Sequence, residues 1–358
     1  MSRPPALRAF QENDFKDTAR FLSSIFGEDA SRWQSWFAHW WRANPAWNES
    51  IPRGWLVRSA GGKPIAFTAN IPFRYVIEGK PGLCCVTGST SVDAAWRRQG
   101  LAAMVGKAFL DQPQADLLLG IDSSHAAYRL WQALGMKSLE RRWQQINYRV
   151  IADAAALTTR LAATAHLPKF VGAVAGRCAA ALMLPITIAA ERSRTLAIDK
   201  VDRFLPQDGD ALESCVASDA STYACRDART LDWLYFGSPY VRGTRAVFVA
   251  RSGPQLVGYL AMKRRDPHSY GLLECRTKNA DRDIARELIF AARAFAQQQQ
   301  VRYIVARPYT PMITFAIPRA VSIRLNGPKV TYCYQFRTPL KDESGWETSP
   351  SDGDVSVN

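Results

Sequence analysis

The strand-to-helix turn in residues 92–110, VDAAWRRQGLAAMVGKAFL, carries residues that few connections of this kind need. Its first residues have the pattern of a strand end, and its last ones have the apolar spacing of a helix. Between them lie Arg97, Arg98, Gln99 and Gly100, followed by the small Ala102. The first N–H groups of a helix lack internal acceptors, and the helix dipole adds partial positive charge there. A glycine that bares the backbone and two arginines that donate charge-assisted hydrogen bonds suit this turn to a diphosphate.

The order of predicted elements around this turn occurs twice. Residues 6–150 are predicted to form a strand, two helices, an antiparallel meander of three strands and then the turn with its helix. A buried strand, another helix and a closing strand at 141–151 follow. Residues 196–337 show the same order more weakly and end on a strand at 329–338. The pattern predicts an α/β (α+β) fold class, with two mixed, mostly antiparallel sheets flanked by helices.

A chain of 358 residues exceeds the usual size of a single core, so two domains are expected. We expect a first domain at 1–150, an alanine-rich helical linker at 151–195, a second domain at 196–340 and a polar, disordered tail at 341–358. The second domain's corresponding turn, CRTKNADRDIARELI, has no glycine and has acidic residues near the helix start. Carboxylates satisfy a helix N-terminus themselves and repel a phosphate, so this second copy is predicted to be degenerate.

Two motifs carry a resemblance to a known family. VDAAWRRQGLA resembles the acyl-CoA pyrophosphate loop of the GNAT superfamily of N-acyltransferases, in which Arg97, Gly100 and Ala102 occupy the three defined positions. Downstream, AYRLWQALGM resembles that family's Ala-x-x-Leu-Tyr-x-x-x-Gly-Phe segment. The predicted order of elements is also the order found in that family. The resemblance covers residues 6–150 and implies a tandem GNAT fold whose second domain is degenerate.

The resemblance implies an acyl-CoA donor, with acetyl-CoA expected, and no metal. The strand bearing Ser91 and Val92 is expected to splay from the strand bearing Gly120 to Asp122, so that backbone groups hold the pantetheine and polarise the thioester carbonyl. The residues implied for binding CoA are Ser91, Val92, Arg97, Arg98, Gln99, Gly100, Leu101, Ala102 and Ser124.

The sequence departs from the family at the positions of the frequent catalytic residues. The position of the family's frequent tyrosine acid is occupied by Trp131, which has no acidic proton, and its frequent asparagine corresponds to Ser124. Tyr128, one helical turn earlier, is the candidate acid, although a packing tyrosine fits the pattern too. Asp122 and His125 stand at a strand end where a base would act, and each is also typical of a helix cap or a surface residue.

Charge and cysteine content limit the other partners. The net charge of +14 indicates an anionic partner, which includes nucleic acid, a phosphorylated cofactor or an acidic membrane surface. No block of Lys and Arg interleaved with aromatics appears, so nucleic acid is not expected. Seven cysteines without framework or zinc spacing, and a beginning without a secretory signal, predict reduced thiols, no metal and a cytoplasmic location.

Two apolar features leave their roles open. Residues 171–190, VGAVAGRCAAALMLPITIAA, hold one charge and are expected to form an interdomain helix packed on both halves, the alternative being a helix in peripheral contact with a membrane surface. The second predicted helix carries a tryptophan cluster, which fits either the core or the wall of a substrate groove. The cluster comprises Trp33, Trp36, Trp40 and Trp41.

Three functions remain open at this level. The first is acyl transfer, most simply of acetyl, from acyl-CoA to an amine or hydroxyl of a small-molecule or glycan/lipid-linked acceptor. The second is a non-catalytic CoA-binding sensor, which Trp131 and the absence of a glutamate from positions 86–92, where the family most often has its base, favour. The third is an aminoacyl-tRNA-dependent peptidyl transferase, because such enzymes share the tandem architecture and would account for the basic charge.

Overall fold

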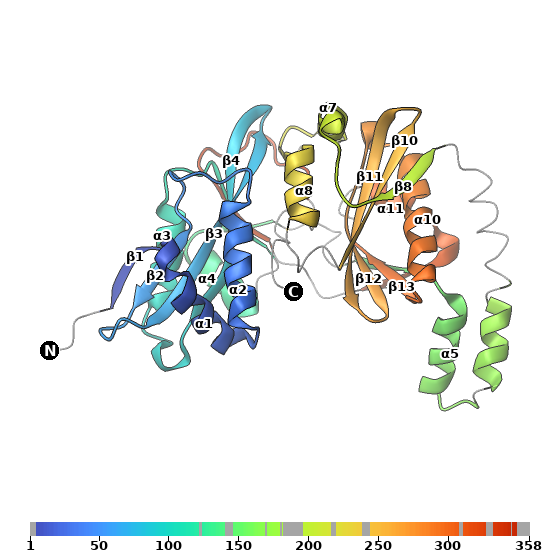
Figure 1. Ribbon diagram of the computed structural model, residues 1–358, viewed down its shortest axis with the longest axis horizontal. Coiled ribbons are helices and arrows are strands. Elements are labelled where there is room, and N and C mark those ends of the chain that lie inside the picture. Colours follow the sequence, from blue (N-terminus) through green and yellow to red (C-terminus); the bar gives the residue numbers. More distant parts are fainter. Residues whose placement is uncertain are drawn as a thin grey trace.

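The computed structural model describes residues 5–121, 124–139, 146–168, 170–179, 181, 196–215, 220–237, 244–307, 311–326, 332–344 and 346–348. Two twisted sheets stand next to each other, and helix α8 (Ala228–Phe236) lies between them (Figure 1). The predicted fold class, two mostly antiparallel sheets flanked by helices, is confirmed.

The first sheet contains most of the strands from the first half of the chain. Its neighbours pair antiparallel except for β4 and β5, which are parallel. In spatial order the strands are β1 (Ala6–Ala9), β2 (Gly54–Arg58), β3 (Pro64–Ile77), β4 (Lys80–Val92), β5 (Leu117–Ile121), β15 (Tyr332–Phe336) and β6 (Lys137–Ser138), with β9 (Tyr223–Ala224) paired to β3.

Alternation along the strands gives this sheet two apolar faces. Leu56 of β2 packs in one cluster with α1 and α2, whereas its neighbours Trp55 and Val57 pack in clusters with α3 and α4. The helices therefore cover both faces of the sheet. They are α1 (Phe15–Phe26) and α2 (Ala30–Phe37), which continues as a π-helical turn, η2 (Ala38–Arg42), on one face, and α3 (Leu101–Asp111) and α4 (His125–Ala133) on the other.

The tryptophan cluster of α2 and η2 belongs to the core. Its four indoles are buried and pack edge-on or tilted against one another and against Phe37. Their exposed fractions are 1% for Trp33, 3% for Trp36 and 0% for Trp40 and Trp41. The core interpretation is thus confirmed, and these rings do not form the wall of a groove.

The second sheet is also mostly antiparallel, with a parallel pair formed by β12 and β13. Helix α10 (Arg282–Gln298) lies on the side of this sheet away from α8 (Figure 1). In order, the strands are β14 (Ser322–Asn326), β7 (Ile146–Ile151), β13 (Tyr303–Ala306), β12 (Ser269–Thr277), β11 (Gln255–Asp266), β10 (Arg245–Ser252) and β8 (Ala197–Val201). The shorter helices are α7 (Gly209–Glu213) and α11 (Pro311–Ala316).

The two sheets exchange their closing strands, which corrects the sequence-based assignment. The strand predicted to close the first unit, β7, pairs with β13 and β14 of the second sheet. The strand predicted to close the second unit, β15, pairs with β5 and β6 of the first sheet. An alternating pattern identifies a strand and its buried face but not its neighbour, so the pairing of these two strands is decided by tertiary contacts.

The junction between the halves is aromatic and buried. The indole Nε1 of Trp233 on α8 donates a hydrogen bond to the backbone oxygen of His39 at 2.7 Å, and the two rings stack with centroids 5.1 Å apart. Burial, with a smaller effect of Arg245, lowers the pKa of His39 to about 3, so this imidazole is neutral. A neutral ring packed on an indole fixes α8 against η2.

Part of the tail predicted to be disordered is ordered. Trp346 is 4% exposed, and its ring lies 5.1 Å from those of both Tyr334 and Phe336 on β15. The N–H of Glu347 donates to the backbone oxygen of Thr222 at 2.8 Å. One indole in a polar stretch buries enough apolar area to fix its neighbours. Residues 349–358 lie outside the described part of the chain.

The predicted interdomain helix is instead one arm of a hairpin. Helix α5 (Ala154–Thr164), the connecting residues 165–168 and the helical residues 170–179, together called the linker hairpin, extend away from both sheets (Figure 1). Phe170 and Val174 are 70% and 57% exposed, so this arm does not pack on both halves. Residues 182–190 of the same prediction lie outside the described residues. Among the described helices, none combines the length and apolar character that crossing a bilayer requires.

Candidate functional site

The turn before α3 is held in place from both of its ends. Asp93 follows β4 and caps a short 3-10 helix, η3 (Ala94–Trp96), by accepting a hydrogen bond from Ala95 N at 2.8 Å. Leu101, the first residue of α3, is 4% exposed and packs in an apolar cluster that Trp96 joins. Residues 97–100 between these anchors are exposed. The turn is therefore a fixed, solvent-facing loop.

Gly100 leaves the N-terminus of α3 without a side-chain cap. Its φ of +78° lies in the left-handed region, and a β-carbon added there would meet nothing within 4 Å. The first hydrogen bond of the helix runs from Met104 N to Gly100 O at 3.0 Å. The N–H groups of Leu101, Ala102 and Ala103 therefore precede the helix's own acceptors. Glycine is needed here for its backbone angle, and its bare side leaves open space in front of these donors.

Two arginines lie in the turn directly before this helix end. Arg97, Arg98 and Gln99 are exposed, and neither arginine forms an ion pair with any residue that the structure describes. Arg98 also has a left-handed φ of +65°, a conformation that costs an ordinary residue about 1–2 kcal/mol. Free guanidinium groups beside three backbone donors and a helix dipole make an anion-binding surface. The residues present therefore fit a diphosphate.

Beside this turn, β4 and β5 separate. Their parallel pairing joins Cys84 to Leu117, Cys85 to Leu118 and Val86 to Leu119. It stops there, although β4 continues to Val92 and β5 to Ile121. Residues 87–90 of β4 are only partly buried, whereas residues 84–86 are buried. The splay predicted from the family resemblance is thus present in the described part of both strands.

A bulge in β4 accounts for the separation. Phe67 of β3 pairs with Ser91 and Ala69 pairs with Gly88, so Ser89 and Thr90 both stand opposite Thr68. Ser89 takes a φ of +51°, and the extra residue bends β4 away from its regular path. Three threonine hydroxyls then meet at the bulge, with Thr68 Oγ1 lying 2.9 Å from that of Thr87 and 2.8 Å from that of Thr90.

Topology brings the turn and the start of α4 to one edge of the sheet. Helices α3 and α4 follow the parallel strands β4 and β5 and pack on the same face of the sheet. Their N-termini therefore lie at the edge where β4 and β5 separate. Gly100 and His125 consequently stand on either side of the splayed strands.

Trp131 is a packing residue. It is 1% exposed, its ring lies 5.6 Å from that of Phe109, and it fills the space beside two glycines, Gly106 of α3 and Gly120 of β5. The position at which the family has its tyrosine acid is thus occupied by a buried indole, which has no acidic proton.

Ser124, predicted to bind CoA, and the described residues among those predicted to be catalytic have structural partners or lie at the surface. Ser124 caps α4 by accepting from Ala127 N at 3.3 Å. Tyr128 is half-buried, and its hydroxyl shares a hydrogen bond with Ser138 Oγ on β6. His125 is exposed at the first turn of α4. Asp122 lies outside the described residues.

The residues predicted to bind CoA differ in whether their side chains or only their backbone groups can reach a ligand. Ser91 is 6% exposed and donates its hydroxyl to Ser89 O at 2.9 Å, and Leu101 is buried, so both offer only backbone to a ligand. Val92 and Ala102 are half-buried. The exposed side chains are those of Arg97, Arg98 and Gln99, together with Ser124, whose hydroxyl caps α4.

Cysteine chemistry is excluded at the point of separation. Burial raises the pKa of the Cys85 thiol to about 12 in spite of a hydrogen bond to Asn70, and both Cys84 and Cys85 are 0% exposed. A thiol in that state supplies no thiolate nucleophile at neutral pH.

Sequence reasoning missed the bulge at Ser89 and the contact between Gly106 and Trp131. A signal for the bulge was available, because TGSTS at 87–91 places a glycine and four small polar residues inside a strand. The sequence gave no such signal for Gly106 of α3, because only the packing of α4 on α3 explains why a glycine stands there.

The corresponding turn of the second half is closed. Asp281 caps α10 by accepting from Asp283 N at 2.8 Å and Ile284 N at 3.1 Å. A carboxylate already occupies the donors of this helix, as the sequence predicted.

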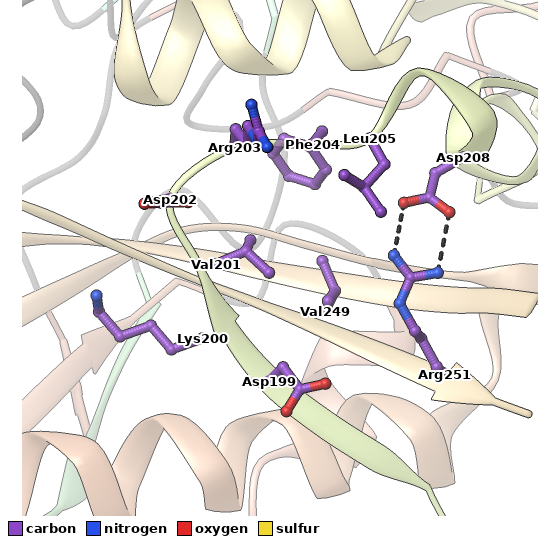
Figure 2. A pocket seen from close by; sticks show the side chains of 10 residues that line it. All are labelled: Asp199, Lys200, Val201, Asp202, Arg203, Phe204, Leu205, Asp208, Val249 and Arg251. Carbon is purple, nitrogen blue, oxygen red and sulfur yellow. Dashed lines mark hydrogen bonds and ion pairs between the residues drawn. The ribbon is translucent and has the colours of Figure 1, made fainter. Parts of the chain in front are cut away.

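Two hollows lie in the second half and beside α8, away from the α3 turn. Figure 2 shows the first, of ≈ 270 Å³, where the Arg251 guanidinium faces the Asp208 carboxylate in an ion pair of 2.6 Å. The second, of ≈ 350 Å³, shares Asp202 and Arg203 with it and reaches Ala43 and α8. None of the predicted site residues lines either hollow.

Comparison with solved structures identifies the fold. N-myristoyltransferase from Saccharomyces cerevisiae, solved with bound myristoyl-CoA and inhibitors, matches with a TM-score of 0.57 and 11% identity over 99% of this chain and 88% of that chain. The GCN5-related N-acetyltransferases from Anabaena variabilis and Kribbella flavida match with TM-scores of 0.55 and 0.53 and with 8% and 12% identity. These matches cover 93% and 94% of this chain, and 73% and 71% of the others.

No protein-family model and no curated protein sequence matches the chain. At these identities the structural matches show the fold alone, which is the GNAT fold that the two motifs implied.

Proposed function

We propose that this protein transfers an acyl group from acyl-CoA to an amine or hydroxyl acceptor. The observation that carries the proposal is the juxtaposition of the uncapped N-terminus of α3 with the splayed strands β4 and β5. A diphosphate site and a gap between strands at one sheet edge are what a CoA thioester needs. The fold supports this, because a solved relative with the same fold contains myristoyl-CoA.

The α3 turn would hold the diphosphate. The N–H groups of Leu101, Ala102 and Ala103 would donate to its oxygens, and Arg97 and Arg98 would add charge-assisted hydrogen bonds. Hydrogen bonds of this kind to a charged group contribute about 1.5–3 kcal/mol each.

The bulged end of β4 would position the thioester. Because β5 no longer pairs with β4 beyond Val86, backbone groups of β4 on that side are free to bind pantetheine and to polarise the thioester carbonyl. A preorganised donor at a developing oxyanion contributes roughly 2.7–4 kcal/mol to catalysis. The acceptor's nitrogen or oxygen would form the new bond to the acyl carbon while the carbon–sulfur bond breaks and the thiolate takes up a proton.

Acetyl is our proposal for the acyl group, and a small-molecule or glycan/lipid-linked compound is our proposal for the acceptor. His125, exposed at the first turn of α4, is our proposal for the base. With Trp131 buried and Tyr128 bonded to Ser138, the departing thiolate would take its proton from solvent or from the acceptor.

The proposal is tested by calorimetric titration with acetyl-CoA and longer acyl-CoA thioesters. Gly100→Glu places a carboxylate in the diphosphate space and should abolish binding. Gly27→Glu is the matched control, because Gly27 has φ +76° and ψ 2°, Gly100 has φ +78° and ψ 0°, and a β-carbon meets nothing within 4 Å at either position. Unchanged affinity in Gly100→Glu would refute the site.

A non-catalytic CoA sensor is the second candidate, and the buried Trp131 in place of an acid favours it. Release of free CoA in the presence of a panel of amines, alcohols and sugars separates the two functions. Binding without release in any acceptor mixture would favour the sensor.

A further inference from the structure

The linker hairpin exposes its largest apolar side chains. Four of them lie on residues near its free end, where α5 ends and the second arm begins, and we call them the hairpin patch. They are Leu161 (58% exposed), Leu167 (49%), Phe170 (70%) and Val174 (57%). Phe170 and Val174 are one helical turn apart and share one face of their helix. Figure 1 shows this end of the hairpin pointing away from both sheets.

The interior of the hairpin is built from small residues instead. A β-carbon added to Gly172 would lie 3.0 Å from Ala162 Cβ and 3.3 Å from Thr159 Cα. One added to Gly176 would lie 3.1 Å from both Ala155 O and Thr158 Oγ1. The two helices therefore approach so closely that their contact has no room for large side chains.

Large apolar side chains outside and small residues between the two helices are the reverse of the arrangement that is stable in water. Two helices in water gain most by burying leucine and phenylalanine between them and exposing small or polar residues. Close approach through glycines four residues apart, with large apolar side chains outward, is the arrangement typical of helices in contact with lipid. The exposed side chains of the hairpin patch therefore indicate that the outer surface of the hairpin contacts an apolar medium.

The charges of the hairpin point to the chemistry of that medium. Residues 154–190 contain Arg160, Lys169 and Arg177 and no aspartate or glutamate. Arg160 and Arg177 are exposed, each within one or two turns of the hairpin patch. Apolar side chains flanked only by positive charge match the interface of an anionic bilayer, where acyl chains lie beneath negative headgroups.

We propose that the hairpin patch inserts into the headgroup–acyl boundary of an anionic lipid bilayer, with Arg160 and Arg177 contacting the lipid phosphates. The hairpin would lie in the interface and not cross it, since no described helix has the length and apolar character for a span. This inference does not depend on the proposed acyl transfer, because no residue of the α3 turn takes part in it.

The test is flotation of the full chain with two kinds of vesicle, phosphatidylcholine mixed with phosphatidylglycerol, and phosphatidylcholine alone. We expect binding to the anionic vesicles, weaker binding to the neutral ones, and a decrease at high salt. Leu167→Ser with Phe170→Ser should lower the partition coefficient about tenfold or more, because two large apolar side chains are lost. Arg160→Gln with Arg177→Gln should remove the preference for anionic vesicles.

Ile323→Ser is the matched control, since Ile323 is an apolar residue on β14, 44% exposed and outside the hairpin. It should bind vesicles like the unmodified chain. Equal partition of the Leu167/Phe170 variant and the unmodified chain would overturn the proposal, and so would an absence of binding to either vesicle at low salt. Light scattering that shows a lipid-free dimer, converted to a monomer by the same two substitutions, would assign the patch to a second copy of the chain.

Discussion

Trp131 of α4 lies against Gly106 of α3, where a β-carbon on the glycine would stand 3.2 Å from the indole Cζ3. This contact sets the distance between the helices whose N-termini flank the splayed strands. The same β-carbon would lie 2.6 Å from Cδ1 of Leu134, the residue that follows α4, so the side chains of Trp131 and Leu134 would both have to move.

We expect Gly106→Val to lower the free energy of unfolding by about 1–3 kcal/mol, because it overpacks this contact. Gly106→Ala distinguishes the cost of the packing clash from the gain in helix propensity. At a helix position with open space around it, replacing glycine by alanine would raise the free energy of unfolding by about 0.8–1.0 kcal/mol. Urea denaturation measures both. A Gly106→Ala variant that is more stable than the unmodified chain would show that α4 adjusts without cost.

Removal of the arginines should weaken CoA binding and leave the fold intact. Arg97→Gln and Arg98→Gln should each lower the affinity for CoA about tenfold, as expected for the loss of one hydrogen bond to a phosphate. Neither arginine has an ion pair among the described residues, so the melting temperature should stay unchanged. Arg129→Gln, on the exposed side of α4, is the control. Equal effects at all three positions would indicate general electrostatic attraction in place of a specific site.

Stability should fall as the solution is acidified, in part through His39. Its folded pKa is lowered to about 3 from the ordinary histidine value of 6.5, so below pH 6.5 the unfolded chain binds a proton that the folded chain does not. Its contribution is fully present above 6.5 and is lost as pH falls toward 3, at a slope of up to about 1.4 kcal/mol per pH unit.

His39→Phe keeps a ring against Trp233 and removes this proton, so its unfolding free energy should depend less on pH between 6.5 and 4. Denaturant titrations of both proteins at several pH values provide the comparison. Parallel curves for the two proteins would mean that His39 is protonated in the folded state.

Tyr128 should matter for packing more than for turnover. Its hydroxyl is engaged by Ser138, so Tyr128→Phe should cost about 0.5–1.5 kcal/mol of stability and leave kcat unchanged. Ser138→Ala should cost a similar amount, and the double variant should cost less than the sum. Stability and acyl-CoA turnover are measured on all three. Lost turnover with intact CoA affinity in Tyr128→Phe would make this tyrosine the acid.

The strand exchange predicts that the first half does not fold alone. Residues 1–139 lack β15, which pairs with β5 from Leu117 to Ile121 and buries Tyr332, Cys333 and Tyr334. We expect this fragment to aggregate, because β5 becomes an open apolar edge. Mixing it with residues 146–358 during refolding should restore a soluble species with near-UV circular dichroism. A soluble, cooperatively unfolding fragment 1–139 would show that β15 is dispensable.

Local chemistry made the conformation of the turn before α3 predictable. The predicted roles of Gly100, the two arginines and the small Ala102 at this strand-to-helix turn depend only on neighbouring residues. The glycine is predicted from the backbone angle, the arginines from charge and the alanine from the space available. The cap at Asp281 in the second half is local too, and it was predicted from the same rule. The core role of the α2 tryptophans, left open by the sequence, was decided by their packing.

Which strands pair with each other, and which helices pack together, could not be predicted from neighbouring residues. Alternation in 141–151 and 329–338 shows two strands with buried faces, yet nothing in either stretch says that β7 joins the second sheet and β15 the first. The apolar stretch at 171–190 likewise predicts a helix, while only its packing on α5 through Gly172 turns Phe170 and Val174 outward. Sequence by itself therefore determined the elements, the fold class and the conformation of the glycine-bearing turn before α3, because these depend on near neighbours in the chain. Tertiary structure decided the strand exchange, the burial of Trp131 and the exposed hairpin patch, because each depends on contacts between residues far apart in sequence.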